Sequence, residues 1–214
     1  MNATDVTAYR RLLIVACFAA AAASCGDLML LYVGNSQRPE LGLAPAPVAV
    51  LWIGAVLGVV GLPIYGAGYW AIARGFARRG LRGAWLIAVC GIGGAIVGAV
   101  IHGLTALEID SALGSAAARP PLEAVAGGDR ALLYLWLTCG VLLLLASLSF
   151  AALQVRSASG AARWLAAANP IVLTVLLVAL SMSAELLRSF VAPAAPNLAH
   201  LLFFLTLARI ADVE

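Results

Sequence analysis

Residues 21–32, AAASCGDLMLLY, fit either the end of a lipoprotein signal or the middle of a membrane helix. Arg10, Arg11, the apolar run after them and Cys25 resemble a signal whose cleavage leaves a lipidated cysteine. However, the apolar run continues directly beyond Cys25 as LMLLYV. The apolar region of a signal is about 7–15 residues long, whereas this run is long enough to span a bilayer. We therefore expect an uncleaved first helix that contains Asp27.

The composition of the chain indicates a membrane protein. Of its 214 residues, 64% are hydrophobic and 11% are charged, against about 45–50% and about 25% in soluble domains. All 13 basic residues are arginine, and they stand singly or in small groups between apolar runs. Such a pattern argues against nucleic acid as a partner and indicates a lipid bilayer, where positive charge sets orientation.

Apolar runs of about 20 residues, the length that crosses a bilayer, occur six times. We therefore predict one all-α domain over residues 1–214, a bundle of six transmembrane helices. The expected spans lie near 12–33, 48–73, 84–107, 131–154, 164–184 and 193–210.

The arginines predict the orientation of this bundle. With the N-terminus inside, nine of the 13 arginines lie on the inner side and four on the outer side. Cytoplasmic segments carry the excess of arginine and lysine. We expect a multi-pass protein of the inner cell membrane with both termini in the cytoplasm.

Glycine pairs predict close helix packing. Gly54 and Gly58 in the second run, and Gly94 and Gly98 in the third, have the GxxxG spacing that lets helices approach closely in lipid. Such seams serve packing within one chain or dimerisation. Six spans are few for a transporter, so a homo-oligomer through the glycine-rich helices is one expectation.

Prolines predict kinks and helix starts. Pro63 and Pro170 fall inside the second and fifth spans, where proline removes a hydrogen bond and kinks the helix. The amide of Asn169 is placed to satisfy a freed group or to cap a turn. Pro193 and Pro196 suit the first turn of the sixth span.

Single polar residues in the apolar runs mark a candidate site. An aspartate at a helix centre costs about 2.5–3.5 kcal/mol. At a rise of about 1.5 Å per residue, Asp27, His102 and His200 lie about 22, 27 and 20 Å from the inner side. Asn197 shares a helix face with His200. We expect a ligand pocket in the outer half of the bundle, with the candidate residues Asp27, His102, Asn197, His200, Tyr65 and Asn169.

The other polar and sulfur residues have simpler expected roles. Glu185 and Arg188 are three residues apart and should form an exposed pair. The four cysteines lie in apolar runs without a CxxC spacing, so we expect buried thiols, including Cys25.

A series of short motifs carries a resemblance to a known family. The motifs are Gly26-Asp27, GLPIYGAGYW, His102, Asn169-Pro170 after Trp164, and Asn197 followed by Phe203-Phe204. The chain resembles a bacterial family of small six-span membrane proteins that is catalogued only as a domain of unknown function. The resemblance implies an architecture and a set of marked positions, and it brings no activity with it.

Three functions remain open. The first is binding or transport of a small molecule, lipid or ion in the outer pocket. The second is a metal-dependent intramembrane hydrolase in which His102, His200 and Asp27 hold zinc, with Glu108 or Glu185 as acid or base; haem between the two histidines is a related alternative. The third is a structural or accessory subunit whose polar layer only fixes helix register. No particular enzyme reaction follows from the residues.

Overall fold

The computed structural model describes residues 3–114, 130–157 and 160–210, and all of its regular elements in these ranges are helices. The all-α prediction is therefore confirmed. The long helices are α1 (Ala3–Asn35), α2 (Val48–Arg78), α3 (Ala84–Leu113), α5 (Arg130–Ser157) and α7 (Glu185–Ile210). The short elements are η1 (Pro39–Leu41), η2 (Gly160–Ala166) and α6 (Pro170–Ser181).

The five long helices are each long and apolar enough to cross a membrane. Their surfaces carry large apolar side chains, among them Phe18, which is 74% exposed, and Val89, which is 68% exposed. A soluble monomer rarely exposes contiguous apolar patches of this kind. The surface of the bundle therefore suits lipid better than water.

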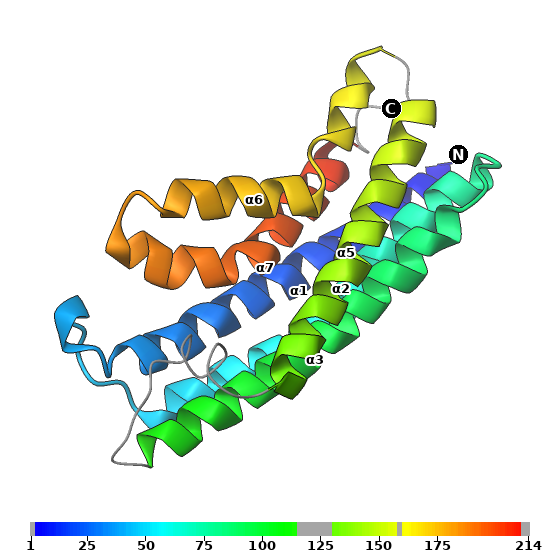
Figure 1. Cartoon of the computed structure of the whole chain (residues 1–214). Coiled ribbons are helices and arrows are strands. Elements are labelled where there is room, and N and C mark those ends of the chain that lie inside the picture. Colours follow the sequence, from blue (N-terminus) through cyan, green and yellow to red (C-terminus); the bar gives the residue numbers. More distant parts are fainter. Residues whose placement is uncertain (1–2, 115–129, 158–159, 211–214) are drawn as a thin grey trace.

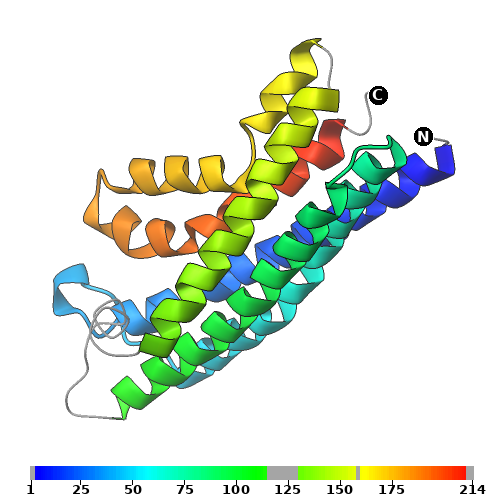
Figure 2. The same ribbon diagram turned by 45° about the vertical axis from the view of Figure 1, so that its right-hand side comes forward.

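The long helices form an antiparallel bundle (Figures 1 and 2). Along the chain α1 packs on α2, α2 on α3 and α3 on α5, while α7 lies against α1 and α6 against α7. The N-terminal end of α1 and the C-terminal end of α7 lie at the same end of the bundle. We call this the proximal end and the opposite one the distal end.

Five of the six expected spans fall inside single helices, namely α1, α2, α3, α5 and α7. The fifth does not. Residues 164–184 are divided between η2 and α6, and α6 has only 12 residues. At about 1.5 Å per residue α6 is about 18 Å long, less than the hydrocarbon thickness of about 30 Å.

The break before α6 has a local cause. Pro170 occupies the first turn of α6 and lies at the helix start, so it does not kink a continuous span as predicted. Asn169 adopts an extended backbone, and its side-chain Oδ1 accepts hydrogen bonds from the backbone N–H groups of Ile171 and Val172, at 3.1 and 3.2 Å. The amide of Asn169 is therefore the helix cap that the sequence suggested.

Removing this cap gives a testable prediction. Asn169→Ala should lower the free energy of unfolding by about 0.5–2 kcal/mol, because two N–H groups of α6 lose their acceptor. Unfolding by detergent titration measures the change. Asn169→Asp keeps the Oδ1 acceptor and should cost clearly less than the alanine variant; equal losses from both would contradict the capping role.

The sixth helix begins earlier than expected. α7 starts at Glu185, so Pro193 and Pro196 lie inside it and the prediction that they form its first turn is wrong. An acidic residue in the first turn interacts favourably with the helix dipole, which suits Glu185 as a start. Proline inside a transmembrane helix is tolerated where neighbouring groups satisfy the freed backbone.

The glycine seams join helices of the same chain. A Cβ added at Gly54 would lie 2.9 Å from the backbone oxygen of Gly26 in α1, and one at Gly94 would lie 2.8 Å from Leu143 in α5. The approach at Gly54 meets backbone and requires glycine, and the one at Gly94 meets a leucine side chain, so both GxxxG pairs serve packing within the chain. A homo-oligomer stays a prediction.

The cysteine prediction holds only in part. Cys90 and Cys139 are buried, Cys17 is half-buried, and Cys25 is exposed. The expectation of a buried Cys25 is wrong because the neighbouring Gly26 faces α2. One residue along a helix is a rotation of about 100°, which turns Cys25 away from the bundle.

Candidate functional site

Asp27 lies at the centre of a polar cluster between three helices. Its Oδ2 accepts a hydrogen bond from Nδ2 of Asn197 on α7 at 2.7 Å. Its Oδ1 is 3.2 Å from Nδ1 of His102 on α3. The structure thus brings together three of the predicted site residues, although Asn197 is 170 positions and His102 is 75 positions from Asp27 along the chain.

Three glycines make the space for the His102 ring. Gly54 and Gly58 on α2 and Gly26 on α1 surround it, and we call them the imidazole slot. Nε2 of His102 is 3.1 Å from the backbone oxygen of Gly54. A Cβ at Gly58 would overlap the ring, and one at Gly26 would lie 3.2 Å from Nε2. The GxxxG pair of α2 therefore packs against the His102 side chain of α3 as well as against α1. This contact with a side chain was not predicted from the sequence.

Tyr65 extends the cluster from α2. Its hydroxyl donates to Oδ1 of Asn197 at 3.4 Å, so the amide of Asn197 links Tyr65 to Asp27. Tyr65 is buried and also lines the cavity described below.

His200 belongs to a separate contact. Its Nδ1 is 2.6 Å from the backbone oxygen of Pro196, and its Nε2 is 2.5 Å from the Tyr69 hydroxyl. A carbonyl oxygen only accepts, so Nδ1 carries the proton and Nε2 accepts from Tyr69. Its ring stacks on Tyr65, with centroids 4.8 Å apart. The predicted convergence on Asp27 therefore does not extend to His200, which faces α2.

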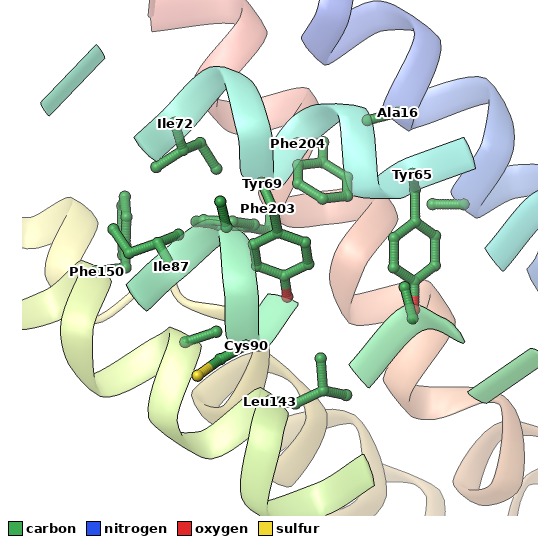
Figure 3. Packing of buried hydrophobic residues seen from close by; sticks show 14 of the residues in the cluster. Ala16, Tyr65, Tyr69, Ile72, Ile87, Cys90, Leu143, Phe150, Phe203 and Phe204 are labelled. Atoms are coloured by element: carbon green, nitrogen blue, oxygen red, sulfur yellow. The ribbon is translucent and has the colours of Figure 1, made fainter. Parts of the chain in front are cut away.

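The tyrosines and phenylalanines behind the cluster form an aromatic core. Figure 3 shows Tyr65 and Tyr69 on one side of α2 with their hydroxyls pointing the same way. Phe204 meets the Tyr69 ring edge-on, with centroids 5.6 Å apart, and Phe203 meets Phe150 in the same manner. This packing holds the two tyrosine hydroxyls in place.

The contact between Tyr69 and His200 predicts a stability effect. Tyr69→Phe should lower the free energy of unfolding by about 1–3 kcal/mol, because Nε2 of His200 is left buried without its donor. Tyr134→Phe is the matched control, since Tyr134 is 63% exposed on α5. Equal stability of the two variants would contradict the hydrogen bond.

The donor geometry does not support the zinc or haem hypotheses. All four ring nitrogens of His102 and His200 lie against the partners described above. Within the described ranges, no group of three or more His, Cys, Asp or Glu side chains is close enough to hold a metal ion. His102, His200 and Asp27 lie at a similar depth in the bundle, but they do not surround a common point where an ion could bind.

A cavity of about 110 Å³ opens beside the cluster. Leucine, isoleucine and tryptophan side chains of α1, α2, α3 and α5 make its walls, and Pro193 and Pro196 of α7 complete them. The side chain of Asp27 is 16% exposed, whereas that of His102 is 4% exposed. The polar lining residues in the described part of the chain are Asp27, Tyr65, His102, Thr105, Cys139 and Asn197.

The predicted residue Asn169 does not line this cavity, because it caps α6.

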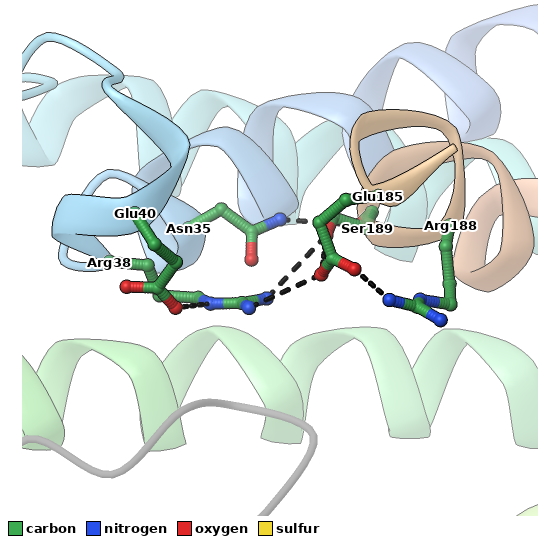
Figure 4. Close-up of polar contacts among 6 residues, drawn as sticks. All are labelled: Asn35, Arg38, Glu40, Glu185, Arg188 and Ser189. Carbon is green, nitrogen blue, oxygen red and sulfur yellow. Dashed lines mark hydrogen bonds and ion pairs between the residues drawn. The ribbon is translucent and has the colours of Figure 1, made fainter.

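A second polar group, the distal clasp, consists of Asn35, Arg38, Glu40, Glu185 and Ser189 (Figure 4). The Arg38 guanidinium contacts Glu40 at 2.8 Å and Glu185 at 3.3 Å. Nδ2 of Asn35 donates to the Ser189 backbone oxygen at 3.1 Å. The clasp joins the distal end of α1 to the start of α7.

The two carboxylates of the clasp are exposed, which limits the strength of its ion pairs. The hydrogen bond from Arg38 lowers the pKa of Glu40 below its ordinary value. The predicted exposed pair of Glu185 and Arg188 is confirmed. Exposed ion pairs contribute about 0–1 kcal/mol each and weaken with salt. The clasp therefore orients the two chain segments more than it stabilises the bundle.

The fold and the site define a class of protein: a helical bundle that has five helices able to cross a membrane and a cavity with a carboxylate, that of Asp27, in its wall. The chain belongs to the family of unknown function DUF6796, whose model matches residues 1–211. This match agrees with the resemblance to an uncharacterised family. Comparison with curated proteins and with solved structures gives no significant match.

Proposed function

We propose that the protein is a multi-pass membrane protein that binds a small molecule with an apolar body and a hydrogen-donating head in the cavity beside Asp27. One observation carries the proposal: a carboxylate that is still 16% exposed forms part of the wall of an otherwise apolar cavity. Ionisable residues inside apolar spans are costly, and they are functional candidates for that reason.

The open cavity favours binding over a purely structural role. A polar knot that only fixes helix register needs to be closed, because every group in it is satisfied by its neighbours. Oδ2 of Asp27 accepts a hydrogen bond from Asn197, Oδ1 contacts His102, and the side chain also lines the cavity; each carboxylate oxygen has more than one lone pair to offer a further donor. A ligand with a donor group can use them.

The size of the cavity limits the ligand. An apolar cavity of about 150 Å³ holds one benzene molecule in another protein, and the cavity here has about 110 Å³. The cavity is smaller than that but open on one side, so a single small ring or a short alkyl body can reach Asp27 with its polar head while part of the body stays outside. A whole lipid would fit only by its head group.

The distribution of arginine supports the orientation with both termini in the cytoplasm. Nine arginines flank the proximal ends of the helices, and cytoplasmic segments carry the positive excess. In this orientation the cavity lies in the outer half of the membrane. The helix α6 is too short to span the bilayer, so in this orientation it enters the membrane without crossing it.

Thermal unfolding in lipid nanodiscs tests the proposed function. Benzyl alcohol and benzylamine serve as probes because each has one apolar ring and one donor head. We expect both to raise the Tm of the parent protein. Asp27→Asn should weaken the binding of benzylamine about tenfold or more, since the charged acceptor is lost.

Thr138→Val is the matched control for this experiment. Thr138 is exposed on α5, one residue from Cys139 in the cavity wall, and its replacement should leave the response to both probes unchanged. No rise in Tm with either probe, or equal responses of the parent and Asp27→Asn, would overturn the proposed function.

A further inference from the structure

Both ring nitrogens of His102 face hydrogen-bond acceptors. Nδ1 lies 3.2 Å from Oδ1 of Asp27, and Nε2 lies 3.1 Å from the backbone oxygen of Gly54. A neutral imidazole has one N–H group, and neither a carboxylate nor a carbonyl has a hydrogen to donate. Beside an ionised carboxylate, a neutral ring would therefore direct a lone pair at one of these oxygens. The doubly protonated ring satisfies both.

The hydrogen bonds around Asp27 show which of its two oxygens is an acceptor. The Tyr65 hydroxyl donates to Oδ1 of Asn197, so the amide nitrogen of Asn197 is turned towards Asp27. Oδ2 of Asp27 therefore accepts from Asn197, and Oδ1 is the oxygen that lies 3.2 Å from Nδ1 of His102. With Nε2–H on the Gly54 oxygen, one exchangeable proton shared between Nδ1 of His102 and Oδ1 of Asp27 satisfies both atoms and leaves the pair with no net charge.

The surroundings contain few other groups that titrate. Asp27 and His102 are the only Asp, Glu, His or Arg residues among the described lining residues of the cavity. Tyr65 of α2 and Cys139 of α5 also line it. On α7, His200 stands behind the Tyr65 ring, and on α1, Cys25 is exposed away from the bundle. The proton of the pair therefore sets the charge of the cavity.

We propose that the cavity takes a small organic amine in its cationic form and that binding displaces the proton shared by His102 and Asp27. This inference rests on the proposed function. The ammonium group donates to the Asp27 carboxylate, and Nδ1 of His102 gives its proton to bulk water. His102 keeps its Nε2–H on the Gly54 oxygen. The charge of the cavity is zero before and after the exchange.

Charge balance is the physical reason for the exchange. An ammonium ion beside an intact imidazolium would leave one uncompensated positive charge in apolar surroundings, which is costly. Release of the proton removes that charge. Trp136 and Tyr65 also line the wall, and aromatic rings attract cations that lie over their faces. A neutral donor of the same shape brings no charge and displaces no proton.

Calorimetric titration in nanodiscs tests this exchange. Binding heats measured in two buffers with different ionisation enthalpies give the number of protons released. Benzylamine should release about one proton at neutral pH, and its affinity should rise about tenfold per pH unit. Benzyl alcohol should bind without release and without this pH dependence.

Two variants make the test specific. His102→Gln keeps a donor for its neighbours but has no exchangeable proton, so it should bind benzylamine without proton release and without the rise in affinity with pH. Glu40→Gln in the distal clasp should behave as the parent. Benzylamine binding to the parent without proton release would overturn this inference alone, whereas no binding of either probe would overturn the proposed function with it.

Discussion

Replacing Gly58 by alanine is expected to lower the free energy of unfolding by about 1–3 kcal/mol, the usual cost of overpacking a filled core. The new Cβ would overlap the His102 ring in the imidazole slot. The ring cannot move without leaving its contacts with Asp27 and Gly54. Unfolding by detergent titration measures this loss.

A second substitution shows whether the ring is the cause. Gly58→Ala combined with His102→Ala should cost less than the sum of the two single variants, because the ring that causes the clash is gone. Gly140→Ala is the matched control, since an added Cβ there meets no atom within 4 Å. Additive losses in the double variant would contradict the imidazole slot.

Replacing Asp27 by leucine is expected to lower the free energy of unfolding by about 3–5 kcal/mol, the cost of removing one partner of a buried ion pair. His102 loses its counter-ion, and the amide of Asn197 loses its acceptor at 2.7 Å. The same detergent titration measures this effect.

The double variant Asp27→Leu/His102→Leu should be more stable than Asp27→Leu alone. Removing both partners leaves no uncompensated charge, and apolar replacements of buried ion pairs are often neutral or stabilising. A double variant less stable than the single one would show that the two side chains are not paired as the structure has them.

The positions of Asp27, His102 and Asn197 could be predicted because depth in a helical bundle follows from residue counts. A fixed rise per residue and alternating helix directions place the three side chains at one level. Rotation about the helix axis does not follow from counts. His200 lies at the same level, yet its ring faces Tyr69 and Tyr65 on α2.

The fifth and sixth spans were the hardest to predict, because apolar residues continue through the break before α6 and through the turn before α7. The cap by Asn169 ends one element and begins another within an apolar run, and nothing in hydropathy marks it. α7 continues through Pro193 and Pro196, which would end a helix in water. In an apolar bundle, neighbouring groups satisfy the freed backbone.

The imidazole slot shows a further limit of sequence patterns. Gly54 and Gly58 predicted a close approach, and the close approach exists. The spacing alone does not say whether a backbone or a side chain fills the space. Only the fold, which places α3 across these glycines, identifies the occupant as His102.

The protonation of the His102 ring is the most direct test of the account. The chain has only two histidines, so ¹⁵N NMR of the labelled rings in nanodiscs, with His102→Gln for assignment, resolves both. Without ligand at neutral pH, we predict both nitrogens of His102 protonated and His200 neutral with its proton on Nδ1. With saturating benzylamine, His102 should become neutral. A His102 ring that is neutral in the free protein, or unchanged by bound benzylamine, would contradict the account.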